Sequence, residues 1–405
     1  MNKSGLFSVL ALSSIGLLMA AGWKGQAQAP RVTLLGDPLP GLTVAQVALF
    51  EEGKELFLEE EGFADGLGPI FNGKSCGECH VQGGVGGAGF DLTVSRVTRI
   101  GGMRNGVYSD LEDLGGPVLE RRSIQEIIPE CPINPEVVPN NAEFVSRRIS
   151  TPLFGLGLME AISPLQILRN IDPLDLNQDG ISGRVNWVMN PETGQYEIGR
   201  FGWKNQISSI HVFSADAYQN EMGITSPLFP TENLPQGQPF DPIWDPVPDP
   251  EEEEGDPDDI DLFADFMRFL APPARKSFSP AVVRGEQTFA AIKCSSCHVP
   301  AMTTGANPVA ALSHKSVRLY SDLLLHDMGV AFDDGVRQGV AQGGEWRTAP
   351  LWGVSVRQLF LHDGRASTID AAIRMHGGEA NRSRQSYVGL SAAKRADLLA
   401  FLNSL

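Results

Sequence analysis

The sequence predicts a mainly α-helical protein that contains two related domains. Two segments, 43–63 and 279–294, carry apolar residues at helical spacing, and each precedes a C-x-x-C-H pentapeptide. A weaker repeat follows in each half of the chain, where the segment RISTPLFGLG (148–157) is similar to WRTAPLWGVS (346–355). These repeats indicate a duplicated unit rather than one large core.

The first residues, 1–29, have the features of a secretory signal peptide. A basic start is followed by an apolar run from Leu6 to Ala21 and by small residues up to Ala29. The run is too short and too poorly flanked for a stable transmembrane helix, although an uncleaved anchor is the alternative. We therefore expect an exported, periplasmic protein that is not inserted in the membrane after processing.

The N-terminal domain is expected to span 30–238. It begins with the helix at 43–63, for which Thr43 is the expected N-cap. Residues 131–229 have no counterpart in the second half and are rich in Gly, Pro and Asn. We therefore expect a loop-rich insertion at this place in the first domain.

An acidic linker, 239–261, separates this domain from the C-terminal domain, 262–405. The linker includes Glu251–Glu254, a composition typical of a solvated segment, although docking of a basic electron donor is the sharper alternative. The C-terminal domain has its own helix before the second pentapeptide, with Ser279 as N-cap and Pro280 in the first turn.

The whole chain has a net charge of -17, which disfavours binding to nucleic acid and anionic membranes and favours binding to small basic partners.

The two pentapeptides, 76–80 and 294–298, are the attachment pattern of c-type haem. One helical turn places the two thiols where each can form a thioether with a haem vinyl group, and the adjacent histidine then reaches the iron. The residues that would hold the two haems are Cys76, Cys79 and His80, and Cys294, Cys297 and His298. Each domain is accordingly predicted to be cytochrome c-like, with one covalently bound haem c.

Three alternatives explain the pentapeptides less well. A zinc site built from both cysteine pairs leaves the following histidine in each copy unexplained. A thioredoxin-like dithiol needs no such histidine and lies between a strand and a helix. A disulfide between Cys76 and Cys79 would close a very small loop. The remaining cysteine, Cys131, is expected to be a small buried apolar residue.

The stretch LFLHDGRASTIDAAIRMHGGEA, 359–380, resembles a region of the bacterial di-haem cytochrome c peroxidases. In that family F-H-D-G and T-L-E-x-A precede an axial Met, and the corresponding residue here, eight after Thr368, is His376. The resemblance implies that His376 is the sixth ligand of the second haem iron, with Met375 as the alternative. A His in place of Met would lower the reduction potential.

This stretch and three further motifs, YSDLLLHDMG, GRFGWK and DLNQDGISGRVNW, resemble a narrower group, the di-haem oxidoreductase family. The likeness runs from about residue 53 to residue 405. It implies two covalently attached haem c groups and a peroxidase-type activity, with hydrogen peroxide as the small-molecule substrate and a small protein as electron donor. The alternatives are an electron carrier without a substrate site and an oxidase of another substrate that uses high-valent haem iron.

The first haem has no convincing second histidine, so its iron is either open or closed by Met103 or Met159. At an open iron, a nearby group must move a proton during O–O cleavage. Glu160 is the catalytic candidate, with a salt-bridged structural Glu as the alternative. His362 is the second catalytic candidate and is expected to hydrogen-bond near the haem.

The other histidines and two tryptophans are expected to have lesser roles. His326 should lie near the haem, whereas His211 and His314 should lie at the surface. Trp203 and Trp352 are candidates for shortening the electron path between the haems, although a buried Trp is mostly a core residue.

A calcium site is the sharper interpretation of Asp175, Asn177, Asp179 and Gly180. They follow the front half of a calcium loop, D-x-N-x-D-G, with oxygens at alternate positions. The twelfth position is Asn186 rather than the bidentate Glu, so an Asx-rich turn is the alternative. The resemblance favours calcium, because di-haem peroxidases hold a calcium ion between their domains.

Overall fold

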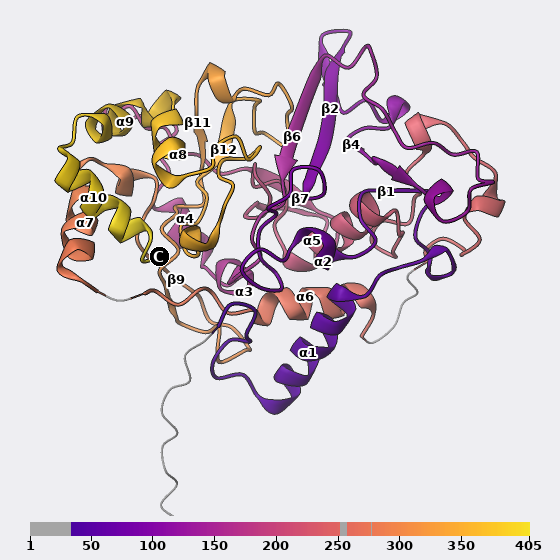
Figure 1. Cartoon of the computed structure of the whole chain (residues 1–405), viewed down its shortest axis with the longest axis horizontal. Coiled ribbons are helices and arrows are strands. Elements are labelled where there is room, and N and C mark those ends of the chain that lie inside the picture. The colour runs from indigo at the N-terminus through magenta and orange to yellow at the C-terminus, as the bar shows by residue number, and fades with distance from the viewer. Residues whose placement is uncertain (1–33, 252–256, 277) are drawn as a thin grey trace, which may run out of the picture. The chain divides into compact units, whose positions relative to one another are not determined.

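A computed structural model describes residues 34–251, 257–276 and 278–405 of the chain (Figure 1). The predicted signal peptide, 1–29, and Glu252–Glu254 of the acidic linker lie outside these residues. Within the described part, no helix is both long enough and apolar enough to cross a membrane. Because residues 1–29 lie outside the described part of the chain, export of the protein stays a prediction.

Helices are spread along the whole described chain. The α-helices are α1 (Val44–Leu58), α2 (Cys76–Cys79), α3 (Leu156–Glu160), α4 (Pro164–Leu168), α5 (Ile210–Ala217), α6 (Asp259–Phe269), α7 (Pro280–Ala291), α8 (Ile369–Met375), α9 (Asn381–Val388) and α10 (Ala392–Leu402). Single 3₁₀ turns are η1 (Phe63–Asp65), η2 (Glu112–Leu114), η3 (Ile124–Glu126), η5 (Pro235–Gly237), η6 (Pro242–Trp244), η7 (Cys294–Ser296), η8 (Val330–Phe332), η9 (Val354–Val356) and η10 (Gly378–Ala380). A π turn, η4 (Tyr218–Met222), follows α5.

Strands accompany the helices in both halves. They are β1 (Ile70–Phe71), β2 (Arg96–Arg104), β3 (Val107–Ser109), β4 (Val118–Leu119), β5 (Arg122–Ser123), β6 (Phe144–Ile149), β7 (Trp187–Asn190), β8 (Gln195–Ile198), β9 (Met302–Thr303), β10 (Ser316–Val317), β11 (Leu325–Asp327) and β12 (Glu345–Arg347). The long strand β2 pairs antiparallel with β3, β4 and β6. In the β2–β6 pair, the register runs from Arg96 opposite Ile149 to Gly101 opposite Phe144. The other strands form antiparallel pairs: β1 with β5, β7 with β8, β9 with β10 and β11 with β12.

The prediction of a mainly α fold with two cytochrome c-like domains is wrong in its fold class. Helices of all types make up 32% of the described residues, and strands with isolated bridges make up 16%. The sheet around β2 is built from residues 96–149, where the prediction of a mainly α fold included no strands. Its central strand, RVTRIGGMR, has no strict alternation of apolar and polar residues, so the period-2 signal is absent. Most other strands have only two to four residues.

The predicted helices before and between the pentapeptides are confirmed, and they cross other helices closely. Thr43 caps α1 and Ser279 caps α7. Helix α1 crosses α6 and α7 crosses α10 (Figure 1). A Cβ on Gly53 would lie 2.1 Å from the carbonyl oxygen of Leu262 in α6, and one on Gly285 would lie 2.0 Å from that of Asp397 in α10. Each crossing therefore requires glycine.

The same two crossings share an aromatic pair. Phe57 lies four residues after Gly53 and contacts Phe266, with ring centroids 4.8 Å apart. Phe289 lies four residues after Gly285 and contacts Phe401, with centroids 5.3 Å apart. Such tilted and edge-to-face contacts are the favoured geometries of aromatic pairs. The repeat seen in the sequence thus extends to how these helices pack.

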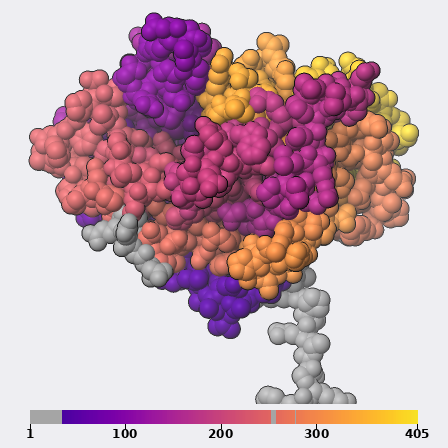
Figure 2. All heavy atoms as spheres, turned by 180° about the vertical axis from the view of Figure 1, so that it is seen from behind, coloured from indigo at the N-terminus to yellow at the C-terminus, as the bar shows by residue number. Residues whose placement is uncertain are grey.

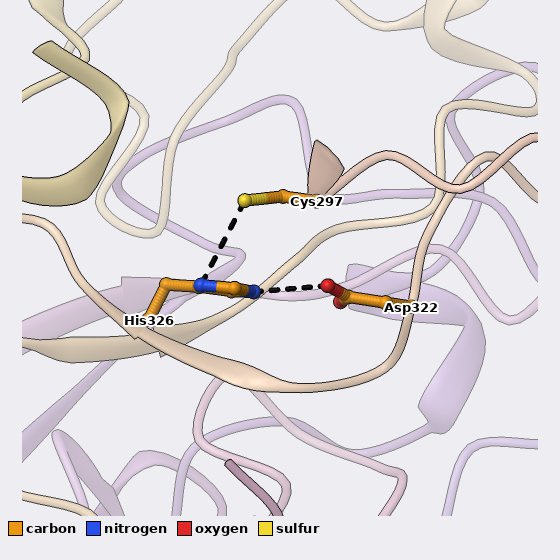
Figure 3. Close-up of side chains that lie close together, drawn as sticks. All are labelled: Cys297, Asp322 and His326. Carbon is orange, nitrogen blue, oxygen red and sulfur yellow. Dashed lines mark hydrogen bonds and ion pairs between the residues drawn. The ribbon is translucent and has the colours of Figure 1, made fainter. Parts of the chain in front are cut away.

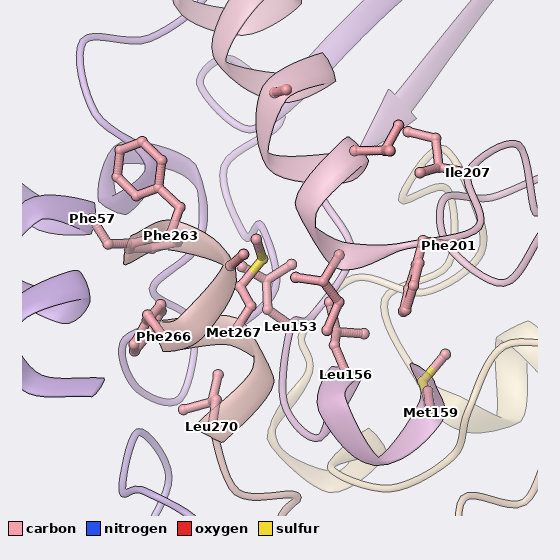
Figure 4. Close-up of a cluster of buried hydrophobic side chains, with 14 of the residues drawn as sticks. Phe57, Leu153, Leu156, Met159, Phe201, Ile207, Phe263, Phe266, Met267 and Leu270 are labelled. Atoms are coloured by element: carbon pink, nitrogen blue, oxygen red, sulfur yellow. The ribbon is translucent and has the colours of Figure 1, made fainter. Parts of the chain in front are cut away.

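The largest core forms where α3, α5 and α6 meet (Figure 4). It includes the buried side chains of Leu153, Leu156, Met159, Phe201, Ile207, Phe263, Phe266, Met267 and Leu270. The same cluster takes in Leu319, Leu323, Leu324 and Trp352 from the second half of the chain. This core therefore holds the segments around Met159 and Trp352, which line a cavity described below.

Part of the predicted acidic linker folds into a crowded carboxylate cluster. One oxygen of each of Glu232, Asp245, Asp249 and Glu251 lies within 4.8 Å of the others. Both carboxylate oxygens of Glu232 are buried without a hydrogen-bond partner among the described residues. Burial, followed by the charges of Asp245 and Glu251, raises the pKa of Glu232 to about 10. Burial likewise raises the pKa of Glu251 to about 7.

We expect Glu232→Gln to stabilise the protein, and to do so more at pH 8 than at pH 5. A carboxyl whose pKa is higher in the folded than in the unfolded chain binds more protons when folded, so the free energy of unfolding falls as pH rises above about 4.5. Removing this group should add about 1–3 kcal/mol at pH 8. Urea unfolding in the presence of EDTA measures it, with the exposed Glu60→Gln as control. A gain that is equal at both pH values would contradict this account.

Candidate haem sites

Each cysteine pair lies on one turn of helix, as its spacing predicts. Cys76 and Cys79 bound α2, while Cys294 opens η7 and Cys297 follows that turn. Both pairs are free of disulfides, and Cys131 is 1% exposed, as expected. Burial raises the pKa of Cys79 and of Cys294 to about 12, whereas redox dithiols have lowered thiol pKa values. These surroundings disfavour the dithiol alternative.

The three histidines predicted to ligate iron are oriented in the same way. In each, ring atom Nδ1 faces a backbone carbonyl oxygen: Gly87 for His80 (3.2 Å), Tyr320 for His298 (3.0 Å) and Ala372 for His376 (2.8 Å). With Nδ1 as donor, Nε2 keeps a lone pair, which is the arrangement found in metal-binding histidines. Burial lowers the pKa of all three, to about 4 for His80 and His298. The neutral ring that can bind a metal therefore predominates at pH 7.

One large cavity brings the second cysteine pair and His376 together. Cys294, Cys297, His298 and His376 all line it. His376 caps the C-terminal end of α8, whose N-cap is Thr368. The empty space amounts to about 1470 Å³, including open solvent at its mouth. The structure thus gathers at one cavity the residues that the sequence assigned to the second haem.

The walls of this cavity fit a haem. Apolar side chains such as Phe289 and Leu402 face it, and so do Arg347 and Arg357. Burial lowers the pKa of both guanidinium groups to about 10. Nε of Arg357 is buried and has no hydrogen-bond partner among the described residues. Haem carries two carboxylates, which would supply acceptors for such buried cations.

His362 also lies in the wall of the large cavity, stacked on an indole ring. Its ring centroid is 3.7 Å from that of Trp346, with 11° between the planes, and both residues line the cavity. On this indole ring, Nζ of Lys204 lies 4.0 Å and Cζ of Arg148 lies 5.0 Å from the centroid. Burial lowers the pKa of His362 to about 4, so its ring is neutral at pH 7.

A buried ion cluster supports this indole. Asp334 accepts a hydrogen bond from Arg148 at 2.9 Å and lies 3.6 Å from Nζ of Lys204. The three side chains are 8%, 3% and 0% exposed. Nζ of Lys204 also donates to the backbone carbonyls of Gln342, Gly343 and Glu345 at 2.7–3.0 Å. The sequence reasoning missed this cluster; Lys204 stands in the GRFGWK motif, but its partners come from distant segments.

A second buried cluster joins the attachment motif to the HGGEA segment. Figure 3 shows its members Cys297, Asp322 and His326. His326 lies between two carboxylates, with Nε2 3.0 Å from Asp322 and Nδ1 2.7 Å from Glu379, and its Nδ1 is 3.7 Å from the sulfur of Cys297. Burial alone would lower the pKa of His326, but hydrogen bonds to Asp322, Cys297 and Glu379 raise it well above its ordinary value. His326 and Glu379 line the large cavity. Glu379 also accepts hydrogen bonds from Ser182 at 2.7 and 3.0 Å.

A smaller cavity of about 450 Å³ of empty space, open solvent included, is linked to the first motif through Thr151, while Cys76, Cys79 and His80 do not line it. The backbone of Thr151 lies next to the ring of His80 and also lines this cavity. Met159, which is 1% exposed, lines it too. Met103 instead lies on β2 and is 37% exposed. Of the two methionines proposed for the first iron, the structure places Met159 at a cavity wall.

The two cavities share part of their walls. Both are lined by Trp203, Arg347, Ala349, Pro350 and Arg357. Trp352 lines only the smaller one. The indole N–H of Trp203 donates to the carbonyl of Ile149 at 2.7 Å, which fixes the ring in place. Trp203 is therefore the candidate tryptophan that faces both cavities.

Glu160 has the contacts of a structural carboxylate. Its Oε1 accepts the backbone N–H of Ile210 at the start of α5 at 2.7 Å, and its Oε2 lies 3.4 Å from Nε of Arg268. It lines neither the large cavity of the second cysteine pair nor the smaller cavity that Met159 lines. Its catalytic role thus stays a prediction, with the salt-bridged alternative matching the observed partners.

The loop predicted to bind calcium turns its side chains inward to its own backbone. Asp175 accepts from Gly180 N–H at 3.1 Å, Asn177 from Asp179 N–H at 2.9 Å, and Asp179 from Ile181 N–H at 3.0 Å. These are the bonds of an Asx-rich turn. Figure 2 shows magenta segments beside the yellow C-terminal residues. Arg382 donates to the backbone carbonyl oxygen of Asp179 at 2.8 Å. Calcium binding by this loop stays a prediction.

A family profile described as "Di-haem oxidoreductase, putative peroxidase" matches residues 138–405, which is more than half of the chain. The chain belongs to this family. The resemblance found in the sequence is therefore confirmed, and membership implies haem as the cofactor of this di-haem oxidoreductase. No curated protein matches the sequence significantly.

Solved structures similar to this di-haem oxidoreductase are distant. Hydrazine synthase from Kuenenia stuttgartiensis is 15% identical over 99% of this chain and 100% of its own, with a TM-score of 0.37. The diheme peroxidase BthA from Burkholderia thailandensis is 13% identical over 92% of this chain and 87% of its own, with a TM-score of 0.37. A MauG-like protein associated with microbial copper homeostasis is 16% identical over 62% of this chain and 89% of its own, with a TM-score of 0.32.

Proposed function

We propose that this di-haem oxidoreductase is an exported, periplasmic c-type cytochrome that reduces hydrogen peroxide with electrons from a small donor protein. One observation supports the proposal most. A single cavity gathers a cysteine pair, the histidine that follows it and a second, distant histidine with its Nε2 left for a metal. This set of groups is the one required to hold a haem between two protein ligands.

The chain's own residues would hold the second haem as follows. Cys294 and Cys297 would form the thioethers, and His298 and His376 would bind the iron. Arg347 and Arg357 would meet the carboxylates, because both are buried cations at the cavity wall. When bound, haem would supply an iron that exchanges single electrons and can bind a small oxygen compound.

The first haem would be held by Cys76, Cys79 and His80, and Met159 would be a candidate for a further ligand of its iron. A two-electron reduction of peroxide suits a protein with two irons, because each iron delivers one electron conveniently. Trp203 supports this division of labour, since its fixed ring lines both cavities. The acidic surface, with its net charge of -17, would attract a basic electron donor.

His362 lines the cavity of the second cysteine pair. With His298 and His376 both bound, this iron would have no position for peroxide, so His362 would move a proton there only in a state in which His376 has left the iron. His362 is neutral at pH 7, so its ring can accept a proton. We expect His362→Gln to lower kcat/KM for peroxide by about 10²-fold or more, with haem content unchanged. Glu160→Gln is the matched comparison and should lower the free energy of unfolding by only about 0.2–1 kcal/mol, with turnover near that of the wild type. If Glu160→Gln lowered kcat/KM for peroxide and His362→Gln did not, Glu160 rather than His362 would be the residue that moves the proton.

The proposal is tested on protein matured in a host that attaches c-type haem. The intact mass should include two porphyrins, and Cys294→Ala with Cys297→Ala should remove one of them. Peroxide turnover with a reduced donor and the spin states of the ferric and half-reduced protein complete the test. Two low-spin irons in both states, without turnover, would leave an electron carrier; turnover of a different substrate alone would leave another oxidase.

A further inference from the structure

A group of metal-ligating side chains lies apart from both cavities, where α5, α6 and the β7–β8 hairpin meet. His211 is in the first turn of α5, Asp258 caps α6 and Asp261 is in the first turn of α6. One ligand atom of each lies within 4.8 Å of the others. None of the three lines the large or the smaller cavity. The proposed peroxidase chemistry therefore gives this group no role.

The ring of His211 is oriented by a carboxylate from the hairpin. Oε1 of Glu192 lies 2.8 Å from Nδ1 of His211, and Oε2 of Glu192 accepts the hydroxyl hydrogen of Ser209 at 2.9 Å. Because both oxygens of Glu192 have partners, its carboxylate is fixed. With Nδ1 as the donor to Glu192, the lone pair of Nε2 points away from the hairpin. A carboxylate behind a histidine in this manner is the usual support of a metal-bound imidazole.

The spacing in front of His211 matches a pair of metal ligands. Nε2 lies 3.5 Å from Oδ1 of Asp261, which is too long for a good N–H···O hydrogen bond. Two ligands bound at 2.0–2.1 Å with a tetrahedral angle between them are roughly 3.3 Å apart. In the neutral ring, Nε2 and the carboxylate are both acceptors, so a cation between them would satisfy both.

We propose that His211, Asp258 and Asp261 bind one divalent transition-metal ion of the zinc type. One imidazole nitrogen and two carboxylate oxygens are three ligands of a tetrahedral site, and water completes it. An imidazole ligand selects zinc and its neighbours over calcium and magnesium, which prefer oxygen ligands throughout. The side chains of His211 and Asp261 are 27% and 49% exposed, so the ion can enter and keep its water.

The test measures zinc bound to the haem-loaded protein, expressed without a histidine tag and stripped with a chelator. Equilibrium dialysis against Zn²⁺ in excess Ca²⁺ and Mg²⁺, followed by elemental analysis, should give one zinc per chain beyond the iron. His211→Asn should lose this zinc. His314→Asn, which changes an exposed histidine elsewhere, should keep it.

A gentler variant distinguishes binding from folding. Glu192→Gln should weaken zinc affinity about 10–100-fold, because it alters only the support of the ligand, while circular dichroism and haem spectra stay those of the wild type. No zinc on the wild type, or equal zinc on the wild type and His211→Asn, would overturn the proposal. The group would then be an imidazolium paired with carboxylates.

Discussion

Replacing His376 with alanine should convert the haem that we propose to be attached through Cys294 and Cys297 from a low-spin to a high-spin ferric state. His376 is partly buried in the wall of the large cavity, and Nδ1 bonded to the Ala372 carbonyl leaves Nε2 for the iron. Losing one of two strong axial ligands opens a coordination position and raises the reduction potential. Optical and electron paramagnetic resonance spectra of the ferric protein, with a redox titration, measure both changes.

Two further variants make this result specific. Met375→Ala should leave the spectra unchanged, because Met375 is 40% exposed and does not line the large cavity, whereas His376 does. His376→Met should keep a six-coordinate iron at a potential above that of the wild type. If Met375→Ala produced the high-spin state and His376→Ala did not, the ligand would be Met375.

Changing Asp334 to Asn should cost about 3–5 kcal/mol of unfolding free energy, the largest stability loss that we expect from a single substitution here. Asp334 is the ion-pair partner of Arg148 and the nearest carboxylate to Lys204, and all three side chains are nearly or wholly buried. Asparagine preserves the shape but leaves the buried guanidinium without a countercharge. Denaturant unfolding monitored by circular dichroism measures the loss.

The neighbouring Asp333 provides the control. Asp333 is exposed, and among the residues that the structure describes its side chain accepts only a local hydrogen bond, from Gly335 N–H at 2.9 Å. Asp333→Asn should therefore change the free energy of unfolding by less than about 0.5 kcal/mol. If Asp334→Asn and Asp333→Asn lowered the free energy of unfolding equally, the buried ion cluster would not be the source of the loss. Because Arg148 holds the pKa of Asp334 below its ordinary value against the effect of burial, this contribution should disappear as pH falls through that lowered pKa.

The sequence was sufficient to predict what depends on short spacing. Cys294, Cys297 and His298 are neighbours along the chain, and one helical turn brings them together wherever they lie. The caps of α1 and α7 were predictable for the same reason, since Thr43 and Ser279 act on the turn that follows them. His376 came from the resemblance, and the structure places it at the cavity of the second cysteine pair.

What the sequence could not provide were contacts between distant segments. Strand β2 has no local sequence signal and is defined by its pairing with β6, about 50 residues further along the chain. Asp334 meets Arg148 from the far half of the sequence, and nothing in the neighbourhood of either residue signals the other. Glu160 was favoured for its position after an echoed motif, whereas its partners, Arg268 and the start of α5, follow from tertiary packing.

The two indole rings of the large cavity differ in how readily each would lose an electron. Trp346 has the ammonium of Lys204 4.0 Å and the guanidinium of Arg148 5.0 Å from its centre, so a positive charge on this ring would be repelled by both cations. Both indole N–H groups donate to a backbone carbonyl oxygen, that of Trp203 to Ile149 at 2.7 Å and that of Trp346 to Phe332 at 2.9 Å, so the difference between the rings comes from the two cations. A strong oxidant generated in this cavity should therefore attack Trp203 first and leave Trp346 intact.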